Sequence, residues 1–445
     1  MLATLLFSSP VYCSNKEWCT ALIVNNKVVA VFLELYMYTI DSIKLNGEVE
    51  HQCSIDSVIA RTLAGELIVV RKGMQDLELF DQSVDLVINS IDAVCGSDVA
   101  AAVKRDGVEK IHVHVALDQV EAVYANARVE LALKMPAVTA KTFESLGVKQ
   151  DFYVHDASLI RLMMPYDVMK SKQKEFQKHL GKLTLHGPHH DHYQNVPINA
   201  INTWTAVGRV DSDNGMLIFP DVWGKNLPLE NGEIRQDQYL GKPLALNMDP
   251  GDILIFHSNH MHASRINSTD ETRVVLTNRI CLDKPEYPDA ARPQKYFLSS
   301  AFPAGLDLST VFSLKGFVGN KRKHLKTGLS RAFYKTATKV GLDFIKYPTE
   351  TNNTIPLEPI AISQLAEKLA EGDIAVIDDK TCAAKVDGKI ISFGRKCPHQ
   401  GADLALGFIE DGKVFCPHHG LTLCLKTGEA SCSSIKSLKV EVVDS

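Results

Sequence analysis

Two short phrases near the C-terminus are rich in residues that bind metals: "CPH" at 397–399 and "CPHH" at 416–419. Sixteen residues separate the two phrases, and each pairs cysteine with histidine. Two Cys and two His could hold zinc, but zinc fingers place Cys with Cys and then His with His. The mixed spacing instead favours a centre with two irons, in which two thiolates bind one iron and two imidazoles bind the other.

The residues that flank these phrases strengthen this interpretation. "GADLALG" follows the first phrase and "GLTLCLKTGEA" follows the second, so residues 353–445 resemble a Rieske ferredoxin domain. Respiratory Rieske proteins carry a disulfide between the ligand loops, but here Gly401 and Leu421 stand near those positions. The phrase "HHGLTL" also has no Ser after its glycine and no Tyr two residues further on, so the cluster sulfurs are expected to receive fewer hydrogen bonds. This predicts a low reduction potential, typical of a domain that passes electrons onward. The resemblance implies these ligands of a [2Fe–2S] cluster: Cys397, His399, Cys416 and His419.

An electron carrier requires an acceptor, and histidines in the middle of the chain suggest one. They occur in "LTLHGPHHDHY" (183–193) and "IFHSNHMHASR" (255–265), whereas no Gly-rich dinucleotide loop follows a strand. A non-haem iron(II) centre needs two imidazoles and one carboxylate on one face. His189 and Asp191 satisfy part of this need, because residues i and i+2 of a strand point to the same side. With 16 His and 53 acids in 445 residues, such a pair arises about twice by chance, so the pair alone is not specific.

The order of the surrounding motifs is more specific. "HHDHY", "WTAVGRVDSDNGMLIFP", "MDPGDILIF", "HMHASRIN" and "TRVVLTN" follow one another and resemble the phytanoyl-CoA dioxygenase family over roughly residues 60–285. That family consists of iron(II)- and 2-oxoglutarate-dependent oxygenases built on a double-stranded β-helix. The resemblance implies that His189 and Asp191 are the proximal iron ligands and His262 the distal one, with His260 as the alternative. Because the proximal acid is aspartate, the position that a halide takes in halogenases is filled, which favours hydroxylation.

The resemblance also implies a site for 2-oxoglutarate. Arg273 lies eleven residues beyond His262, past the turn "NSTDET", and its planar fork suits a carboxylate. We expect Arg273 to anchor the distal carboxylate of 2-oxoglutarate, with Ser264 and Trp204 as weaker pocket candidates. A surface arginine on a strand is the alternative.

The elements that must position these residues are mainly β with flanking helices. We predict a jelly-roll or cupin-like double-stranded β-helix plus a small all-β Rieske domain, because short apolar runs broken by turns dominate residues 183–285. Helical spacing marks residues 75–91 and 118–134. Residues 286–352 contain a basic stretch at 320–326 and a helical pattern at 330–345. The predicted divisions are an unassigned segment (1–59), the oxygenase domain (60–285), an insert (286–352) and the Rieske domain (353–445).

Composition excludes several classes of protein. A net charge of -5 and a pI near 6.3 give no reason to expect nucleic acid or an anionic membrane as partner. The apolar run "VVAVFLELYMYTI" spans only thirteen residues and contains Glu34, so it is too short to cross a bilayer. Besides the two predicted ligands, eight cysteines show no paired framework. We therefore expect the protein to be located in a reducing cytoplasm.

The favoured hypothesis is an iron(II)/2-oxoglutarate dioxygenase that uses O2 to hydroxylate a small molecule. In this hypothesis the Rieske domain returns iron(III) to iron(II), and an NAD(P)H-dependent ferredoxin reductase supplies the electron; a homo-oligomer is compatible with it. A first alternative is an oxygenase driven by Rieske electrons without 2-oxoglutarate. Such enzymes carry the cluster near the N-terminus and an Asp-x-x-His-x-x-x-x-His phrase, which is absent here. A second alternative is a non-catalytic electron-transfer or iron-sensing protein.

Overall fold

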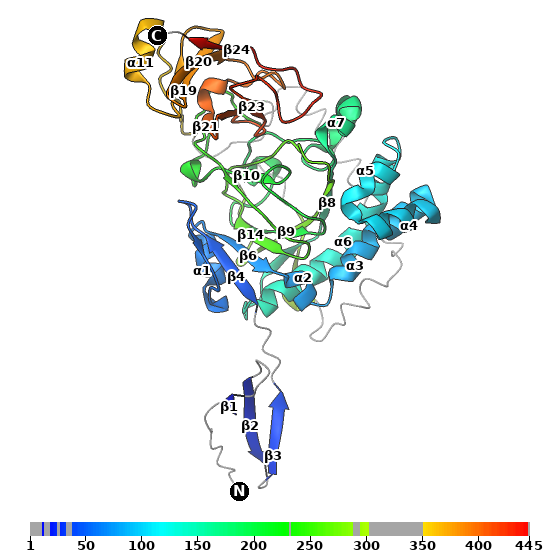
Figure 1. Ribbon diagram of the computed structural model, residues 1–445. Coiled ribbons are helices and arrows are strands. Elements are labelled where there is room, and N and C mark those ends of the chain that lie inside the picture. The colour runs from blue at the N-terminus through cyan, green and yellow to red at the C-terminus, as the bar shows by residue number, and fades with distance from the viewer. Residues whose placement is uncertain are drawn as a thin grey trace, which may run out of the picture.

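The computed structural model describes residues 38–230, 233–287, 294–301 and 350–443 (Figure 1). It also assigns three antiparallel strands near the N-terminus: β1 (Val11–Tyr12), β2 (Trp18–Val24) and β3 (Lys27–Phe32). The predicted basic stretch at 320–326 and the helical pattern at 330–345 lie outside the described residues.

A large antiparallel sheet forms the centre of the molecule. Its strand order is β17-β7-β16-β9-β14-β6-β4-β5, and β8 also pairs with β16. The bounds are β4 (Thr39–Ile43), β5 (Val49–Glu50), β6 (Leu67–Arg71), β7 (Tyr153–His155), β8 (Leu159–Met163), β9 (Ala200–Ala206), β14 (Ile253–His257), β16 (Arg273–Cys281) and β17 (Tyr296–Leu298).

A smaller sheet packs against the large one. Its order is β13-β10-β15, with a separate hairpin of β11 and β12 beside it. Trp204 and Phe256 of the large sheet share a buried apolar cluster with Ile218 of the small sheet. Two sheets that bury their facing side chains against each other form a sandwich, as expected for a double-stranded β-helix. The bounds are β10 (Met216–Ile218), β11 (Leu229–Glu230), β12 (Glu233–Ile234), β13 (Leu244–Ala245) and β15 (His262–Ser264).

Helices cover the outer face of the large sheet: α6 packs against β7, β8 and β16, and α3 packs against α6 (Figure 1). The helical spacing predicted at 75–91 and 118–134 is confirmed in α3 and α6, although α6 continues past Pro136. The bounds are α1 (Val58–Leu63), α2 (Gly73–Asp76), α3 (Phe80–Cys95), α4 (Ser97–Asp106), α5 (Ile111–His114), α6 (Val120–Ser145), α7 (Tyr166–Met169) and α8 (Gln173–Phe176).

The C-terminal domain consists of two small sheets, one α-helix, α11 (Ile362–Lys368), and a short 3-10 helix (Leu404–Leu406). The first sheet has the order β18-β19-β20-β24, and the second has the order β21-β22-β23. This domain lies against the β10 end of the sandwich (Figure 1). The bounds are β18 (Ile374–Val376), β19 (Thr381–Val386), β20 (Lys389–Gly394), β21 (Phe408–Glu410), β22 (Lys413–Phe415), β23 (Thr422–Cys424) and β24 (Val440–Val443).

The predicted fold class, strand-rich with flanking helices and a small all-β C-terminal domain, is confirmed. The division at residue 60 stays a prediction, and strands β4 and β5, which precede it, belong to the large sheet. The described part of the chain contains no helix long and apolar enough to cross a membrane.

Candidate metal centre and co-substrate pocket

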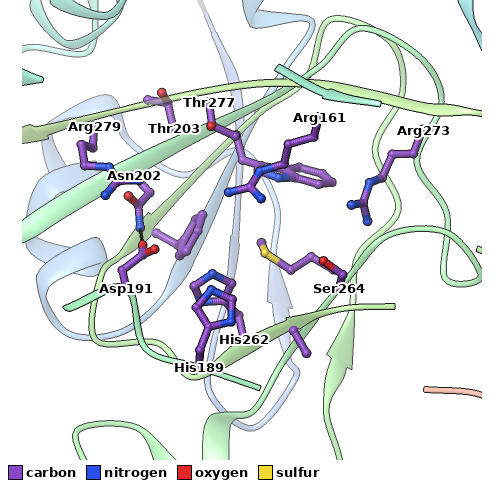
Figure 2. Close-up of a pocket in the computed structure, with 14 residues that line it drawn as sticks. Arg161, His189, Asp191, Asn202, Thr203, His262, Ser264, Arg273, Thr277 and Arg279 are labelled. Atoms are coloured by element: carbon purple, nitrogen blue, oxygen red, sulfur yellow. Dashed lines mark hydrogen bonds between the residues drawn. The ribbon is translucent and has the colours of Figure 1, made fainter. Parts of the chain in front are cut away.

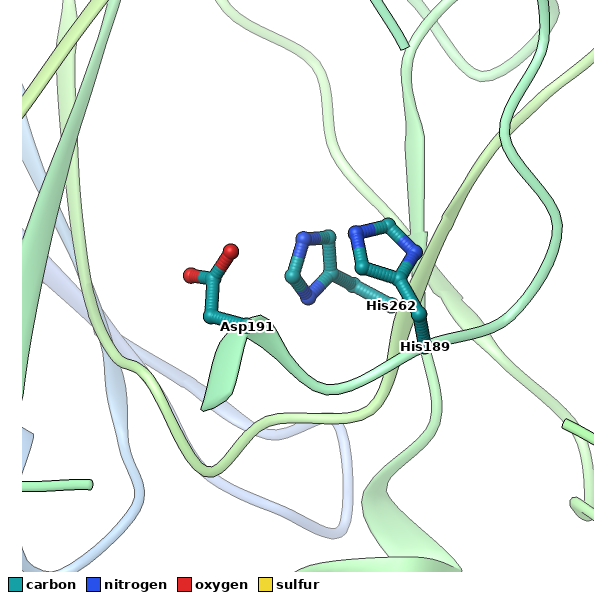
Figure 3. Close-up of side chains that lie close together, drawn as sticks. All are labelled: His189, Asp191 and His262. Atoms are coloured by element: carbon teal, nitrogen blue, oxygen red, sulfur yellow. The ribbon is translucent and has the colours of Figure 1, made fainter. Parts of the chain in front are cut away.

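Three buried side chains meet at one end of the sandwich. His189 lies just before a short 3-10 helix that begins at Asp191, and His262 is the first residue of β15. Backbone hydrogen bonds of 3.0 and 3.1 Å join His189 and His262 in both directions. One ligand atom from each of the three residues lies within 4.8 Å of the other two (Figure 3). The structure thus brings together the three predicted iron ligands.

Hydrogen bonds fix the orientation of both imidazoles. Nδ1 of His189 lies 2.8 Å from the Gly187 carbonyl oxygen, and Nδ1 of His262 lies 3.0 Å from that of His260. A carbonyl only accepts, so each Nδ1 carries the proton and each Nε2 keeps a free lone pair. Burial lowers the pKa of both histidines, so both are neutral, as metal binding requires.

The carboxylate of Asp191 is held in its charged form. Burial alone would raise its pKa, but the charge of Arg279 and a hydrogen bond from Asn202 hold the pKa below its ordinary value. The Asn202 amide donates to Oδ2 of Asp191 at 2.6 Å. Two neutral imidazoles and one carboxylate on one side of a buried pocket fit iron(II), and the opposite side is left for other ligands.

Arg273 faces the same pocket from the start of β16 (Figure 2). The side chain is only 2% exposed, and the guanidinium lies 5.5 Å from the centre of the Trp204 ring. Its Nη1 donates to the carbonyl oxygens of Asn214, at 2.7 Å, and Gly215. Burial, and then the charge of Arg161, lowers the pKa of Arg273 to about 9, which leaves it positively charged at neutral pH.

Of the other predicted residues, some line the pocket and one does not. Ser264 and Trp204 line the pocket with Arg273 and the three candidate ligands. His260, the alternative distal ligand, instead packs its ring 4.3 Å from Trp223 and does not line the pocket. The geometry therefore favours His262 for the distal position, and the individual roles stay predictions.

Several pocket residues were not predicted from the sequence. Arg279 could have been found, because it shares a strand face with Arg273, six residues along β16. Asn202 likewise shares a face of β9 with Trp204. Arg161 carries no such signal, because the pairing of β8 with β16 is not visible in the sequence. The residues of the pocket that sequence reasoning missed are Arg161, Asn202, Thr203, Met216, Phe256, Ala263, Thr277 and Arg279.

The four predicted cluster ligands lie on two loops of the C-terminal domain, one after β20 and one after β22. The thiols of Cys397 and Cys416 contact each other, and the hydrogen bond from Cys416 lowers the pKa of Cys397. The rings of His399 and His419 lie 5.1 Å apart, and burial lowers the pKa of both. A pair of sulfurs beside a pair of neutral imidazoles fits a two-iron cluster with one iron bound at each end.

A buried His–Asp–His set on a double-stranded β-helix, with an arginine facing the same pocket, defines an iron(II)/2-oxoglutarate oxygenase of the non-haem class. Comparison with known proteins agrees. Residues 102–275 match the family described as phytanoyl-CoA dioxygenase (PhyH), and residues 360–440 match the Rieske [2Fe-2S] domain. The chain therefore combines an oxygenase domain of the PhyH family with a C-terminal Rieske domain, and both resemblances drawn from the motifs are confirmed.

Curated relatives match short stretches of the chain. The chain is 37% identical over 65 residues to the ferredoxin subunit of 3-phenylpropionate/cinnamic acid dioxygenase from Escherichia coli (strain K12), covering 14% of this chain and 61% of that protein. It is 46% identical over 37 residues to the vanillate O-demethylase oxygenase subunit from Pseudomonas sp. (strain HR199 / DSM 7063), covering 8% of this chain and 10% of that one. The chain thus spans less than two thirds of each relative.

Solved structures match larger parts of the chain at lower identity. The epimerase SnoN, in complex with Fe3+, alpha ketoglutarate and nogalamycin RO, is 18% identical with a TM-score of 0.26, over 38% of this chain and 62% of that one. The non-heme monooxygenase ThoJ is 15% identical with a TM-score of 0.26, over 48% of this chain and 76% of that one.

Proposed function

We propose that this chain is an iron(II)- and 2-oxoglutarate-dependent oxygenase that hydroxylates a small molecule. We further propose that its Rieske domain supplies the electron that returns the mononuclear iron to the ferrous state. The observation that carries the first part is the buried set of His189, Asp191 and His262 in one pocket with Arg273.

The guanidinium of Arg273 has hydrogen-bond donors available for a carboxylate. Its Nη1 is occupied by two backbone carbonyls, whereas its buried Nε has no hydrogen-bond partner. The edge formed by Nε and Nη2 therefore faces the pocket for a two-pronged contact with the distal carboxylate of 2-oxoglutarate. The Trp204 ring fixes the plane of the guanidinium, and Ser264 lies beside it.

His189, Asp191 and His262 would hold the metal from one side and leave the pocket side open. Bound iron(II) supplies the chemistry of oxygen activation, for which oxidative decarboxylation of 2-oxoglutarate to succinate and carbon dioxide provides two electrons. Asn202 keeps the Asp191 carboxylate turned towards the two imidazoles. The surrounding buried side chains exclude water from the reacting groups.

Charge in the pocket bears on the class of substrate. Three arginines, Arg161, Arg273 and Arg279, line a pocket whose lining contains one acid, Asp191. With an iron(II) ion and the two carboxylates of 2-oxoglutarate, an excess of about two positive charges remains. Buried positive charge without a partner is costly. We infer that the substrate carries an acidic group.

Anaerobic spectroscopy tests the oxygenase assignment. With iron(II) bound and the cluster reduced in advance, 2-oxoglutarate is expected to produce a metal-to-ligand charge-transfer band in the visible difference spectrum. Arg273→Ala and Asp191→Ala should lose the band, and Arg209→Ala, which removes an exposed arginine outside the pocket, should keep it. If no band forms although iron is bound, the Rieske domain becomes the favoured source of electrons for oxygen activation.

A further inference from the structure

The Rieske domain is fastened to the oxygenase domain by polar contacts at the edge of their interface. The carboxylate of Asp167, in α7, accepts hydrogen bonds from the backbone N–H groups of Ser433 and Ser434 at 2.9 and 3.0 Å and from both hydroxyls. Lys242 forms an ion pair of 2.7 Å with Glu410. These five contacts define one docked arrangement within a single chain.

The centre of the interface lies at the cluster ligands themselves. The backbone N–H of Ile266 donates to the carbonyl oxygen of His419 at 2.8 Å. The ring of Tyr166 meets the ring of His399 edge-on, with 5.2 Å between centres. Gly420 adopts φ +62°, and a Cβ there would lie 3.0 Å from Leu217 of the small sheet. The loop therefore turns tightly enough to bring its histidine against the oxygenase domain.

Two short connections lead from this contact to the candidate iron site. Along the chain, Ile266 lies four residues after His262, a span of at most about 14 Å in extended chain. Through space, the ring of His186 stacks on the ring of His189, with 3.7 Å between centres and an interplanar angle of 28°. His186 is 6% exposed, and its carbonyl accepts from Ser264 N–H at 2.9 Å.

His186 also lies near the cluster ligands. The N–H of Ser264 donates to the His186 carbonyl, and the N–H of Ile266, two residues further along the chain, donates to the His419 carbonyl. His186 therefore lies between the proximal ligand of the mononuclear site and a histidine of the cluster site. It has no place in the metal-binding set itself.

We propose that the electron passes within one chain, from His419 to the mononuclear site, across the Ile266 contact and the stacked rings of His186 and His189. This inference rests on the proposed role of the Rieske domain. In the step, the reduced cluster loses one electron and iron(III) gains one to become iron(II), so the charge balances without another reactant. His186 acts as a positioning residue that shortens the gap between the two sites.

Single-turnover spectroscopy tests the proposal without measuring product. The full chain is loaded with iron, the mononuclear site is oxidised to iron(III) under anaerobic conditions, and the cluster is reduced by a pulse of photochemical reductant. Reoxidation of the cluster is then followed by its visible absorbance over a hundredfold range of protein concentration. We expect a single first-order rate that does not change with concentration.

Two sets of variants locate the route. The exposed double variant Asp167→Ala/Lys242→Ala should slow cluster reoxidation at least about tenfold, because five contacts that hold the docked state are lost. The matched control Asp387→Ala/Lys426→Ala, which breaks an exposed ion pair inside the Rieske domain, should leave the rate unchanged. His186→Leu should slow the rate, and His186→Phe, which keeps a ring against His189, should restore most of it, with the charge-transfer band intact in both.

Each outcome separates the inference from the function on which it rests. A rate proportional to protein concentration overturns transfer within one chain, and a rate unaffected by both the docking variant and His186→Leu overturns the proposed route; either result leaves the electron-supplying role standing. If iron(III) never oxidises the cluster at any concentration, the role proposed for the Rieske domain fails. The charge-transfer band with 2-oxoglutarate would still report on the oxygenase site independently.

Discussion

At the scale of single residues, Asn202 decides how Asp191 faces the metal. The amide reaches the carboxylate from β9, and both side chains are buried, with 4% and 6% of their surface exposed. A carboxylate with one oxygen occupied by an amide presents the other oxygen in a fixed direction. Asn202 would therefore act on a bound metal through Asp191, without contributing a ligand of its own.

Asn202→Ala is expected to weaken iron(II) binding by about tenfold to a hundredfold, the usual cost of losing a partner that orients a ligand. Anaerobic titration monitored by the charge-transfer band with 2-oxoglutarate measures the change. Asn199→Ala is the control, because that amide bonds the Lys284 carbonyl away from the pocket. Equal iron affinity in both variants would show that Asp191 needs no such support.

Arg279 provides the test of the proposed acidic substrate. It is 8% exposed, and its buried Nε has no hydrogen-bond partner. We expect a set of small acids, compared with the matched primary amides, to stimulate succinate formation from 2-oxoglutarate. Arg279→Gln should lose that stimulation while keeping the charge-transfer band. Stimulation by the amides alone would contradict the inference.

The candidate ligands could be named from the sequence because the ordered motifs around them resemble a known family, and the structure brings these candidates together in one pocket. His189 and Asp191 are two residues apart. Arg273 lies eleven residues after His262, past a turn and at the start of the next strand. Arg161 was not predictable, because it reaches the pocket only through the pairing of β8 with β16. The sequence alone carries no record of which strands are neighbours when their separation exceeds a hairpin.

At the scale of elements, one ion pair closes the first ligand loop of the Rieske domain. Arg395, just after β20, contacts both oxygens of the Asp403 carboxylate at 2.7 to 2.9 Å. Asp403 also accepts the backbone N–H of Ala405 and so caps the short 3-10 helix Leu404–Leu406. Cys397 and His399 lie on the loop between these two anchors, so the pair holds the loop ends together.

Asp403→Ala should release this loop and leave Arg395 unpaired. We expect the free energy of unfolding of the Rieske domain to fall by about 1–3 kcal/mol, with faster loss of the cluster. The decay of visible absorbance in the presence of a chelator measures that loss. Asp379→Ala, an exposed acid on a turn of the same domain, is the control. Identical decay in the two variants would mean that the ion pair does not support the ligand loop.

Element boundaries were less predictable than element types. The pattern at 118–134 predicted a helix, but α6 continues to Ser145 although Pro136 lies inside it. The continuation is buried on several sides, with Met135, Val138 and Phe143 all in the core. A helix buried on several sides shows no apolar stripe, and packing compensates for the backbone hydrogen bond that proline removes.

At the scale of the whole molecule, buried neutral histidines make the stability of the folded state depend on pH. Burial lowers the pKa of His186, His190 and His260 to about 3 and that of His257 to about 4. In an unfolded chain each has its ordinary pKa near 6.5. Between these values the unfolded state binds more protons, so falling pH favours unfolding.

The metal-free protein should therefore be most stable above about pH 6.5 and lose stability as the pH falls towards 4. Each histidine contributes a slope of up to about 1.4 kcal/mol per pH unit. Urea unfolding followed by tryptophan fluorescence at pH 7, 6 and 5 measures the trend. His257→Phe should show a shallower dependence. The same urea midpoint at all three values would contradict the assignment of neutral buried histidines.

The two domain types were predictable because each carries an ordered set of motifs, but their contact was not. Docking depends on Asp167 meeting a Ser–Ser pair more than 260 residues away, and on a backbone hydrogen bond between Ile266 and His419. Main-chain groups are the same at every position, so the pattern of side chains carries no information about such a contact. The predicted reductase and the cytoplasmic location also stay predictions.

The two ligand loops differ in their access to the outside. Cys416 and His419 are buried beside the oxygenase domain, whereas Gln400, next to His399 on the other loop, is exposed. In the proposed transfer, an external electron donor would approach the Gln400 side, because the His419 carbonyl on the other loop accepts the Ile266 N–H of the oxygenase domain. Electrons would then enter the domain at the first ligand loop and leave it at the second. A donor could therefore bind while the second loop stays docked on the oxygenase domain.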